Sequence, residues 1–79
     1  MKTFILYGTR FCHLCELAQG MIDDVGLAAD DVQIETVDIS DSDILFERYG
    51  IRIPVLQHTD LRELEWPFTA VQLRLFLNS

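Results

Sequence analysis

Residues 12–15 read Cys-His-Leu-Cys, and they come shortly after an apolar run at residues 3–7 (Thr-Phe-Ile-Leu-Tyr) that is typical of a β-strand. From residue 14 to residue 25 apolar side chains recur at the spacing of an α-helix. The two cysteines therefore fall where a strand passes into the first turn of a helix. At that spacing their sulfur atoms can reach disulfide distance, and the unpaired N–H groups of a helix start favour a thiolate. This placement indicates a redox-active pair.

The two cysteines are expected to differ in reactivity. Cys12 lies at the helix end and Arg10 adds a positive charge two residues earlier, so the pKa of Cys12 should fall below the value of about 8.5 of a free thiol. Cys15 lies one turn further in, where apolar neighbours such as Phe11 should cover it, and its pKa should be the higher. His13 either tunes the pair and relays a proton, or is a spacer that faces solvent.

Composition predicts one small globular domain over residues 1–79, because 49% of the residues are hydrophobic and 24% are charged. The sequence has no apolar run long enough to span a membrane, and its start lacks the apolar core and cleavage site of a signal peptide. We therefore expect a cytoplasmic protein without membrane contact.

Two cysteines three residues apart cannot cross-link distant segments of a secreted fold by a disulfide. The pair is therefore either redox-active or a pair of metal ligands. A structural zinc needs about four nitrogen or sulfur ligands. Beyond the two cysteines the chain offers only His13 and the distant His58. A metal site within a single chain is therefore not expected.

The formal net charge of −7 argues against a nucleic-acid partner, because affinity for phosphates comes mainly from Lys and Arg. Between Phe11 and Glu47 there is no Lys or Arg, whereas Asp and Glu recur throughout that stretch. We interpret this stretch as a solvated acidic face rather than a docking surface for a basic partner.

Hydrophobic periodicity and capping signals predict an element order of β-α-β-α-β-β-α. The expected strands cover residues 3–7, 32–37, a run from Pro54 to His58, and 61–66, and the expected helices cover residues 12–25, 41–49 and 68–77. The first two strands should be parallel, and a two-residue turn at Thr59-Asp60 should join the last two into a hairpin. Ser40 is expected to cap the second helix, and Thr69 with Gln72 should form a capping box on the third.

This order, with a cysteine pair at the first helix and a lone proline at the start of the third strand, resembles the thioredoxin superfamily. In size the chain is similar to a glutaredoxin-like protein, and the resemblance covers essentially the whole chain. It implies an α/β thioredoxin fold with a four-stranded mixed sheet flanked by helices. It also implies a cis bond between Ile53 and Pro54 whose backbone faces Cys12. The N–H and C=O groups before Pro54 should then be free to pair with an extended substrate chain.

The function that the resemblance implies is thiol-disulfide exchange, in which Cys12 attacks a disulfide and Cys15 resolves the mixed disulfide. The expected substrate-binding residues are Arg10, His13, Arg52, Ile53 and Pro54. The expected partners are disulfide-bearing proteins and a thiol reductant or reductase, with no cofactor and with a monomeric chain. The alternative is a non-catalytic thioredoxin-fold module that holds a protein partner or a metal or iron–sulfur cluster bridging a dimer.

The sequence departs from glutaredoxins where these would hold glutathione. Their Thr-Val-Pro run is Arg52-Ile53-Pro54 here, and their Gly-Gly-x-Asp stretch is residues 65–68, Glu-Trp-Pro-Phe. Poor activity on glutathione mixed disulfides is therefore expected, although Arg52 could compensate by pairing with a glutathione carboxylate. Trp66 and Phe68 are expected in the core or over the hairpin, where Trp66 could border the site, and His58 is expected at the surface.

Overall fold

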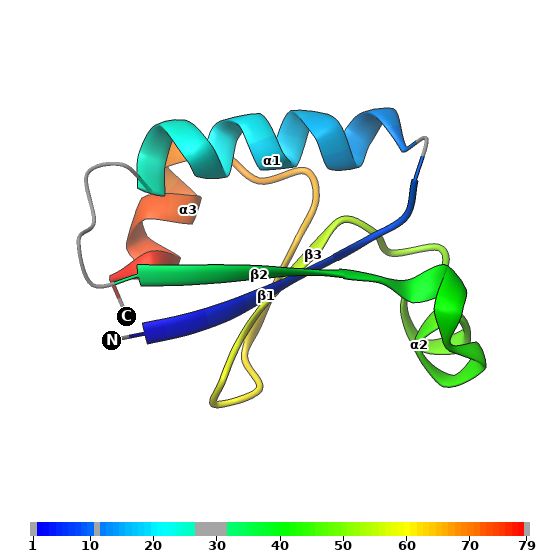
Figure 1. The fold of residues 1–79 in the computed structure, drawn as a ribbon. Helices are drawn as coiled ribbons and strands as arrows, with labels where there is room; N and C mark the ends of the chain where they lie inside the picture. Colours follow the sequence, from blue (N-terminus) through cyan, green and yellow to red (C-terminus); the bar gives the residue numbers. More distant parts are fainter. Residues whose placement is uncertain (1, 11, 27–31, 79) are drawn as a thin grey trace.

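The computed structural model describes residues 2–10, 12–26 and 32–78, and Figure 1 shows the arrangement of its helices and strands. In chain order the elements are β1 (Lys2–Gly8), α1 (His13–Gly26), β2 (Val32–Asp38), a short 3-10 helix η1 (Ile39–Asp41), α2 (Asp43–Tyr49), β3 (Val55–His58), β4 (Glu63–Glu65) and α3 (Ala70–Leu77). Apart from η1 this is the predicted order. None of these helices is long and apolar enough to cross a membrane, as judged over the described residues.

The four strands form one mixed sheet in the order β2-β1-β3-β4. β1 pairs in parallel with β2 and antiparallel with β3, and β3 pairs antiparallel with β4. The nearly continuous apolar run of β1 therefore lies at the centre of the sheet, where both faces are covered, and the alternating β2 lies at an edge. The predicted mixed sheet and the predicted parallel pairing are confirmed.

Successive side chains of β1 enter two different cores, because a strand presents alternate residues to opposite faces. Phe4 and Leu6 point to the face that α1 and α3 cover, and Figure 1 shows α1 running along that side of the sheet. The buried residues of this core are Phe4, Leu6, Ala18, Ile22, Leu56, Phe68, Leu73 and Leu77. On the opposite face α2 and η1 enclose a smaller core of Tyr7, Ile39, Tyr49 and Val55. The cysteines belong to the α1 side, since α1 carries them.

The start of α2 differs from the prediction. Ser42, and not Ser40, is its N-cap, and the Ser42 hydroxyl accepts a hydrogen bond from the N–H of Leu45. Ser40 is engaged elsewhere, because both its N–H and its hydroxyl donate to the carboxylate of Asp38. The chain turns through η1 and buries Ile39 completely before α2 begins. The capping box of Thr69 and Gln72 on α3 is confirmed.

The hairpin between β3 and β4 is also longer than predicted. Its loop has three residues and not two, because the N–H of His58 donates to the carbonyl of Arg62 and the N–H of Leu61 donates to the carbonyl of His58. Leu61 has a φ of 77°, the left-handed residue that such three-residue loops require. β4 is consequently confined to three residues.

His58 is not the surface residue that its place near a turn suggested. Its ring packs edge-on against Phe4 at 4.8 Å, and its side chain is only 13% exposed. Nδ1 of His58 lies 3.1 Å from the N–H of Asp60 and 3.2 Å from the carboxylate of the same residue. Phe68 is buried in the α1-side core and Trp66 packs against it, as predicted for core residues.

Candidate active site

Cys12 occupies the N-cap position of α1. The helix begins at His13, one residue later than predicted, and the carbonyl of Cys12 accepts the first helical hydrogen bond from the N–H of Glu16 at 3.1 Å. Cys12 Sγ in turn accepts a hydrogen bond from the N–H of Cys15 at 3.2 Å. A cap side chain normally bonds this same N–H group, so the sulfur of Cys12 takes the place of a capping oxygen. An N–H dipole at a helix start stabilises negative charge on that sulfur.

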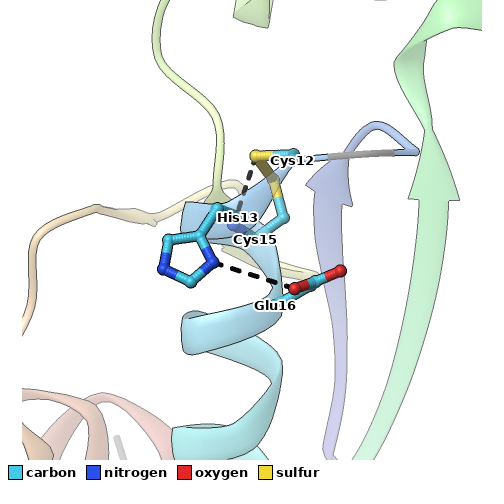
Figure 2. Close-up of a disulfide and its surroundings, with 4 residues drawn as sticks. All are labelled: Cys12, His13, Cys15 and Glu16. Carbon is cyan, nitrogen blue, oxygen red and sulfur yellow. Dashed lines mark hydrogen bonds and ion pairs between the residues drawn. A yellow bond between two sulfur atoms is a disulfide. The ribbon is translucent and has the colours of Figure 1, made fainter.

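Cys12 and Cys15 are joined as a disulfide across the first turn of α1, as Figure 2 shows. Their Cα atoms lie 5.2 Å apart, within the ordinary range for a disulfide. Both residues are half-buried. Phe11, expected to cover Cys15, lies outside the described residues.

Gly8, the last residue of β1, lies against Cys15. A Cβ atom placed on Gly8 would come within 3.0 Å of Cys15 Sγ and 3.3 Å of its Cβ. Phe4 and Leu6 point to the same face of the sheet, so the missing side chain of Gly8 is what lets the first turn of α1 approach the strand. Gly8 was not among the site residues expected from the sequence, which gave no sign of this contact.

We expect Gly8→Ala to lower the free energy of unfolding of the oxidised protein by about 1–3 kcal/mol, because the new methyl group overpacks a sulfur tied into a disulfide. Urea unfolding measures this. Gly20→Ala is the matched control, since Gly20 is an exposed residue of α1 with no atom within 4 Å of an added Cβ. That control should gain about 0.5–1 kcal/mol from helix propensity. Equal stability of the two variants would contradict the close contact at Gly8.

A cavity of about 330 Å³ opens beside the disulfide, between α1 and the ends of β1 and β2. Both cysteines line it, together with Leu6, Gly8, Thr9, Arg10, Glu16, Gln19, Thr36, Val37 and Asp38. The register explains the shared location, because parallel pairing sets Gly8 beside Asp38 at the carboxyl ends of the two strands. The carboxyl ends of neighbouring parallel strands meet at one edge of a sheet, so the predicted parallel pairing could have indicated that these residues lie together. Thr36 and Asp38 were nevertheless not predicted as site residues.

Arg10 is one of the residues that line this cavity, and it forms an ion pair with Asp38. The two side chains are 3.7 Å apart, and that of Arg10 is 85% exposed. Hydrogen bonds from Ser40, followed by the charge of Arg10, hold the pKa of Asp38 below its ordinary value. Asp38 is therefore ionised at neutral pH and pairs with Arg10. The predicted effect of Arg10 on the pKa of Cys12 stays a prediction. The predicted contact of Arg10 with substrate stays a prediction.

His13 faces solvent. Its side chain is 79% exposed, and its Nδ1 lies 3.9 Å from a carboxylate oxygen of Glu16. In Figure 2 the His13 ring and the Glu16 carboxylate project to different sides of α1. This position agrees with the spacer interpretation, and a proton-relay role for His13 stays a prediction.

The bond between Ile53 and Pro54 is cis, as predicted, and a second cis bond joins Trp66 to Pro67. The pairing of Tyr7 with Val55 sets Pro54 at the same end of the sheet as Gly8 and the disulfide. The expected free N–H group before Pro54 is wrong, however. The N–H of Ile53 donates to the carbonyl of Tyr49 at 3.0 Å, so it is already paired within the protein.

Arg52 is engaged on the side of β4. Its guanidinium donates to Glu63 at 2.7 Å and also to Glu65, and it lies 5.2 Å from the centre of the Tyr49 ring. Burial alone would raise the pKa of Glu63, but hydrogen bonds from Tyr49 and Arg52 lower it overall. Arg52 is not among the residues that line the cavity at the cysteines. Its role in binding substrate stays a prediction.

The described part of the chain holds no group of three or more His, Cys, Asp or Glu side chains that could bind a metal ion. The cysteine pair, a helix start and an adjoining cavity are thus the chemical features of this site. A sulfur held at a helix N-terminus beside an open cavity can exchange disulfides.

Comparisons with known proteins agree with this geometry. A family model described as a glutaredoxin-like domain matches residues 3–78. The X-ray structure of target protein XcR50 from X. campestris shares 37% sequence identity, covers 95% of this chain and 95% of its own, and has a TM-score of 0.83. Protein Ne2328 from Nitrosomonas europaea shares 23% identity over 96% of this chain and 91% of its own, with a TM-score of 0.80.

Thioredoxins are more distant. Oxidised thioredoxin O2 from Arabidopsis thaliana shares 20% identity over 99% of this chain and 73% of its own, with a TM-score of 0.69. At that identity the likeness concerns the fold alone, and it confirms the predicted thioredoxin fold. A search of curated protein sequences found no match.

Proposed function

Because the chain belongs to the glutaredoxin-like domain family, we propose that it is a thiol-disulfide oxidoreductase acting on protein disulfides. In the reduced protein the Cys12 thiolate attacks one sulfur of a substrate disulfide and expels the other as a thiolate. The Cys15 thiolate then attacks Cys12 Sγ of the mixed disulfide and expels the second substrate sulfur. Two electrons pass to the substrate, and the Cys12–Cys15 disulfide remains.

The observation that carries this proposal is the capping role of Cys12. Its Sγ lies 3.2 Å from the N–H of Cys15, a donor that becomes more favourable as the sulfur gains negative charge. Cys12 is therefore the better attacking thiolate, and Cys15, packed against Gly8, is the resolving thiol. An external thiol reductant or reductase returns the disulfide to the dithiol.

We further propose that glutathione mixed disulfides are poor substrates. The stretch at 65–68 that replaces the glutathione seat of glutaredoxins begins with Glu65, and like charge there opposes a glutathione carboxylate. Arg52 was the side chain that could compensate. Its guanidinium is bound by Glu63 and Glu65, so pairing with glutathione would have to break an existing ion pair.

The test compares two substrates at equal concentration with excess dithiothreitol as reductant. The protein should reduce a peptide disulfide well above the rate with dithiothreitol alone. Its acceleration of the reduction of a peptide–glutathione mixed disulfide should be about tenfold smaller. Equal acceleration of both would refute the glutathione part. Acceleration of neither, together with metal or iron–sulfur absorbance in the purified protein, would favour a binding module that uses the cysteines as ligands.

A further inference from the structure

A substrate bound at Cys12 can extend over the disulfide in two directions, toward Pro54 or toward β2. On the Pro54 side, several hydrogen-bonding groups are already engaged. On the Pro54 side the N–H of Ile53 bonds the carbonyl of Tyr49, and the guanidinium of Arg52 bonds two carboxylates. The carbonyl of Pro54 accepts a hydrogen bond from the N–H of Trp66 at 3.1 Å. The N–H of Ile53, the carbonyl of Pro54 and the guanidinium of Arg52 thus already have partners within the protein.

The opposite side, toward β2, offers an open and amphipathic cavity. Leu6 gives the cavity an apolar surface, and both cysteines contribute to its wall. Thr9 and Thr36 also line it, and the hydroxyl group of neither makes a hydrogen bond within residues 2–10, 12–26 and 32–78. A volume of about 330 Å³ is enough for one long side chain.

The charges around the cavity leave one carboxylate uncompensated. Arg10 and Asp38 pair with each other, and Asp38 also accepts two hydrogen bonds from Ser40. Within the described residues Glu16 lies 3.9 Å from Nδ1 of His13 and pairs with no Lys or Arg. Figure 2 shows the Glu16 side chain extending from α1 toward the side of β1 and β2. The cavity therefore presents an excess of negative charge in a protein whose net charge is −7.

We propose that this cavity is a specificity subsite, which receives the side chain next to the reacting cysteine of a protein disulfide and favours a basic one. The inference rests on the proposed oxidoreductase function and adds its substrate class. The thiol-disulfide step itself is unchanged, since the subsite holds the substrate chain while the electrons pass through Cys12 and Cys15. Glu16 acts as a specificity residue and the unpartnered threonines accept the polar end of the side chain.

Peptide disulfides that differ only in the residue next to the cysteine, Lys or Glu, test the charge preference. The wild-type protein should show a kcat/KM ratio of Lys over Glu peptide of about threefold to fivefold at low salt, the size of one exposed ion pair. Glu16→Lys should bring the ratio to one or below. Glu47→Lys on α2, an exposed residue outside the cavity, makes the same charge change and should keep the wild-type ratio. Equal ratios in all three proteins would overturn the role of Glu16.

A second pair of variants tests the space itself. Thr36→Tyr fills the cavity from β2, and Gln33→Tyr adds the same bulk to an exposed residue of the same strand that does not line the cavity. The measured quantity is the rate on the Lys peptide divided by the rate on uncharged hydroxyethyl disulfide, which is too small to need the subsite. Thr36→Tyr should lower this quotient about tenfold, while Gln33→Tyr keeps it.

The two proposals fail in different ways. A wild-type protein that reduces neither the peptide nor hydroxyethyl disulfide would remove the oxidoreductase function. A wild-type protein that reduces both, with an unchanged quotient in Thr36→Tyr, would leave that function standing and overturn the subsite.

Discussion

Cys15→Ser should attack a disulfide and then stay joined to its product, while Cys12→Ser should not attack at all. With 5,5′-dithiobis(2-nitrobenzoate), the reduced wild-type protein should release two equivalents of thionitrobenzoate and end as the intramolecular disulfide. Cys15→Ser should release one equivalent and keep the other as a stable mixed disulfide on Cys12, because no resolving thiol remains. Turnover of a peptide disulfide by Cys12→Ser should fall to the rate without protein.

The capping geometry makes this pair of variants well matched. Serine is among the preferred N-cap residues, so Cys12→Ser should keep the start of α1 and the stability of the reduced protein while removing the nucleophile. Cys15→Ser keeps the backbone N–H that donates to Cys12 Sγ. Alkylation of Cys12 in this variant should therefore reach half of its maximal rate at a lower pH than alkylation of free cysteine.

Two outcomes would contradict these roles. If Cys12→Ser retains the faster-alkylated thiol and Cys15→Ser does not, attack and resolution are assigned to the wrong residues. If neither remaining thiol reacts faster than free cysteine at neutral pH, the helix start does not activate the pair, and the oxidoreductase proposal loses its main support.

The elements that sequence analysis placed correctly have local causes. The continuous apolar run of β1 is typical of a strand and suits its central position, and the alternation in β2 suits its edge position. The capping box at Thr69 depends on residues three apart, so it can be recognised without knowing the fold. The cis bond before Pro54 followed from the family resemblance and not from local chemistry.

Two of the errors, at His58 and at Arg52, lie where the partner is distant in sequence. His58 reads as a turn residue, yet strand pairing sets it opposite Phe4, where it packs. Arg52 reads as a free cation near Pro54, yet β4 returns antiparallel to β3 and brings Glu63 and Glu65 to it. Both contacts depend on the register of strands, which local patterns leave open.

For the site, the sequence predicted the cysteine pair but not the space beside it. The pair is a local motif, whereas the walls of the cavity come from α1, β1 and β2. Only the parallel pairing of Gly8 with Asp38 reveals that residues thirty positions apart flank one sulfur pair. Thr36 and Asp38 therefore become visible as candidate site residues once the register is known.

Wild-type protein should lose stability between pH 10 and pH 12, and Tyr49→Phe should lose less. Tyr49 is 1% exposed and stacks on Tyr7 at 4.3 Å, and its hydroxyl donates to Glu63 at 2.6 Å. Burial, then the hydrogen bond to Glu63 and its negative charge, raise the pKa of Tyr49 from 10 to about 12. The folded state thus keeps a proton that the unfolded state loses above pH 10, so the free energy of unfolding falls as the pH rises through this window.

Urea unfolding at about pH 9 and about pH 11 measures the effect, which should reach roughly 1–1.5 kcal/mol for the wild type. Tyr49→Phe should be less stable by about 1–2 kcal/mol at pH 9, because Glu63 loses one hydrogen-bond donor, and its decrease at pH 11 should be correspondingly smaller. Tyr7→Phe is the matched control, since it removes a hydroxyl that donates to Gln57 and leaves the Tyr49–Glu63 bond in place. An equal decrease in all three proteins would show that groups other than Tyr49 carry the alkaline loss of stability.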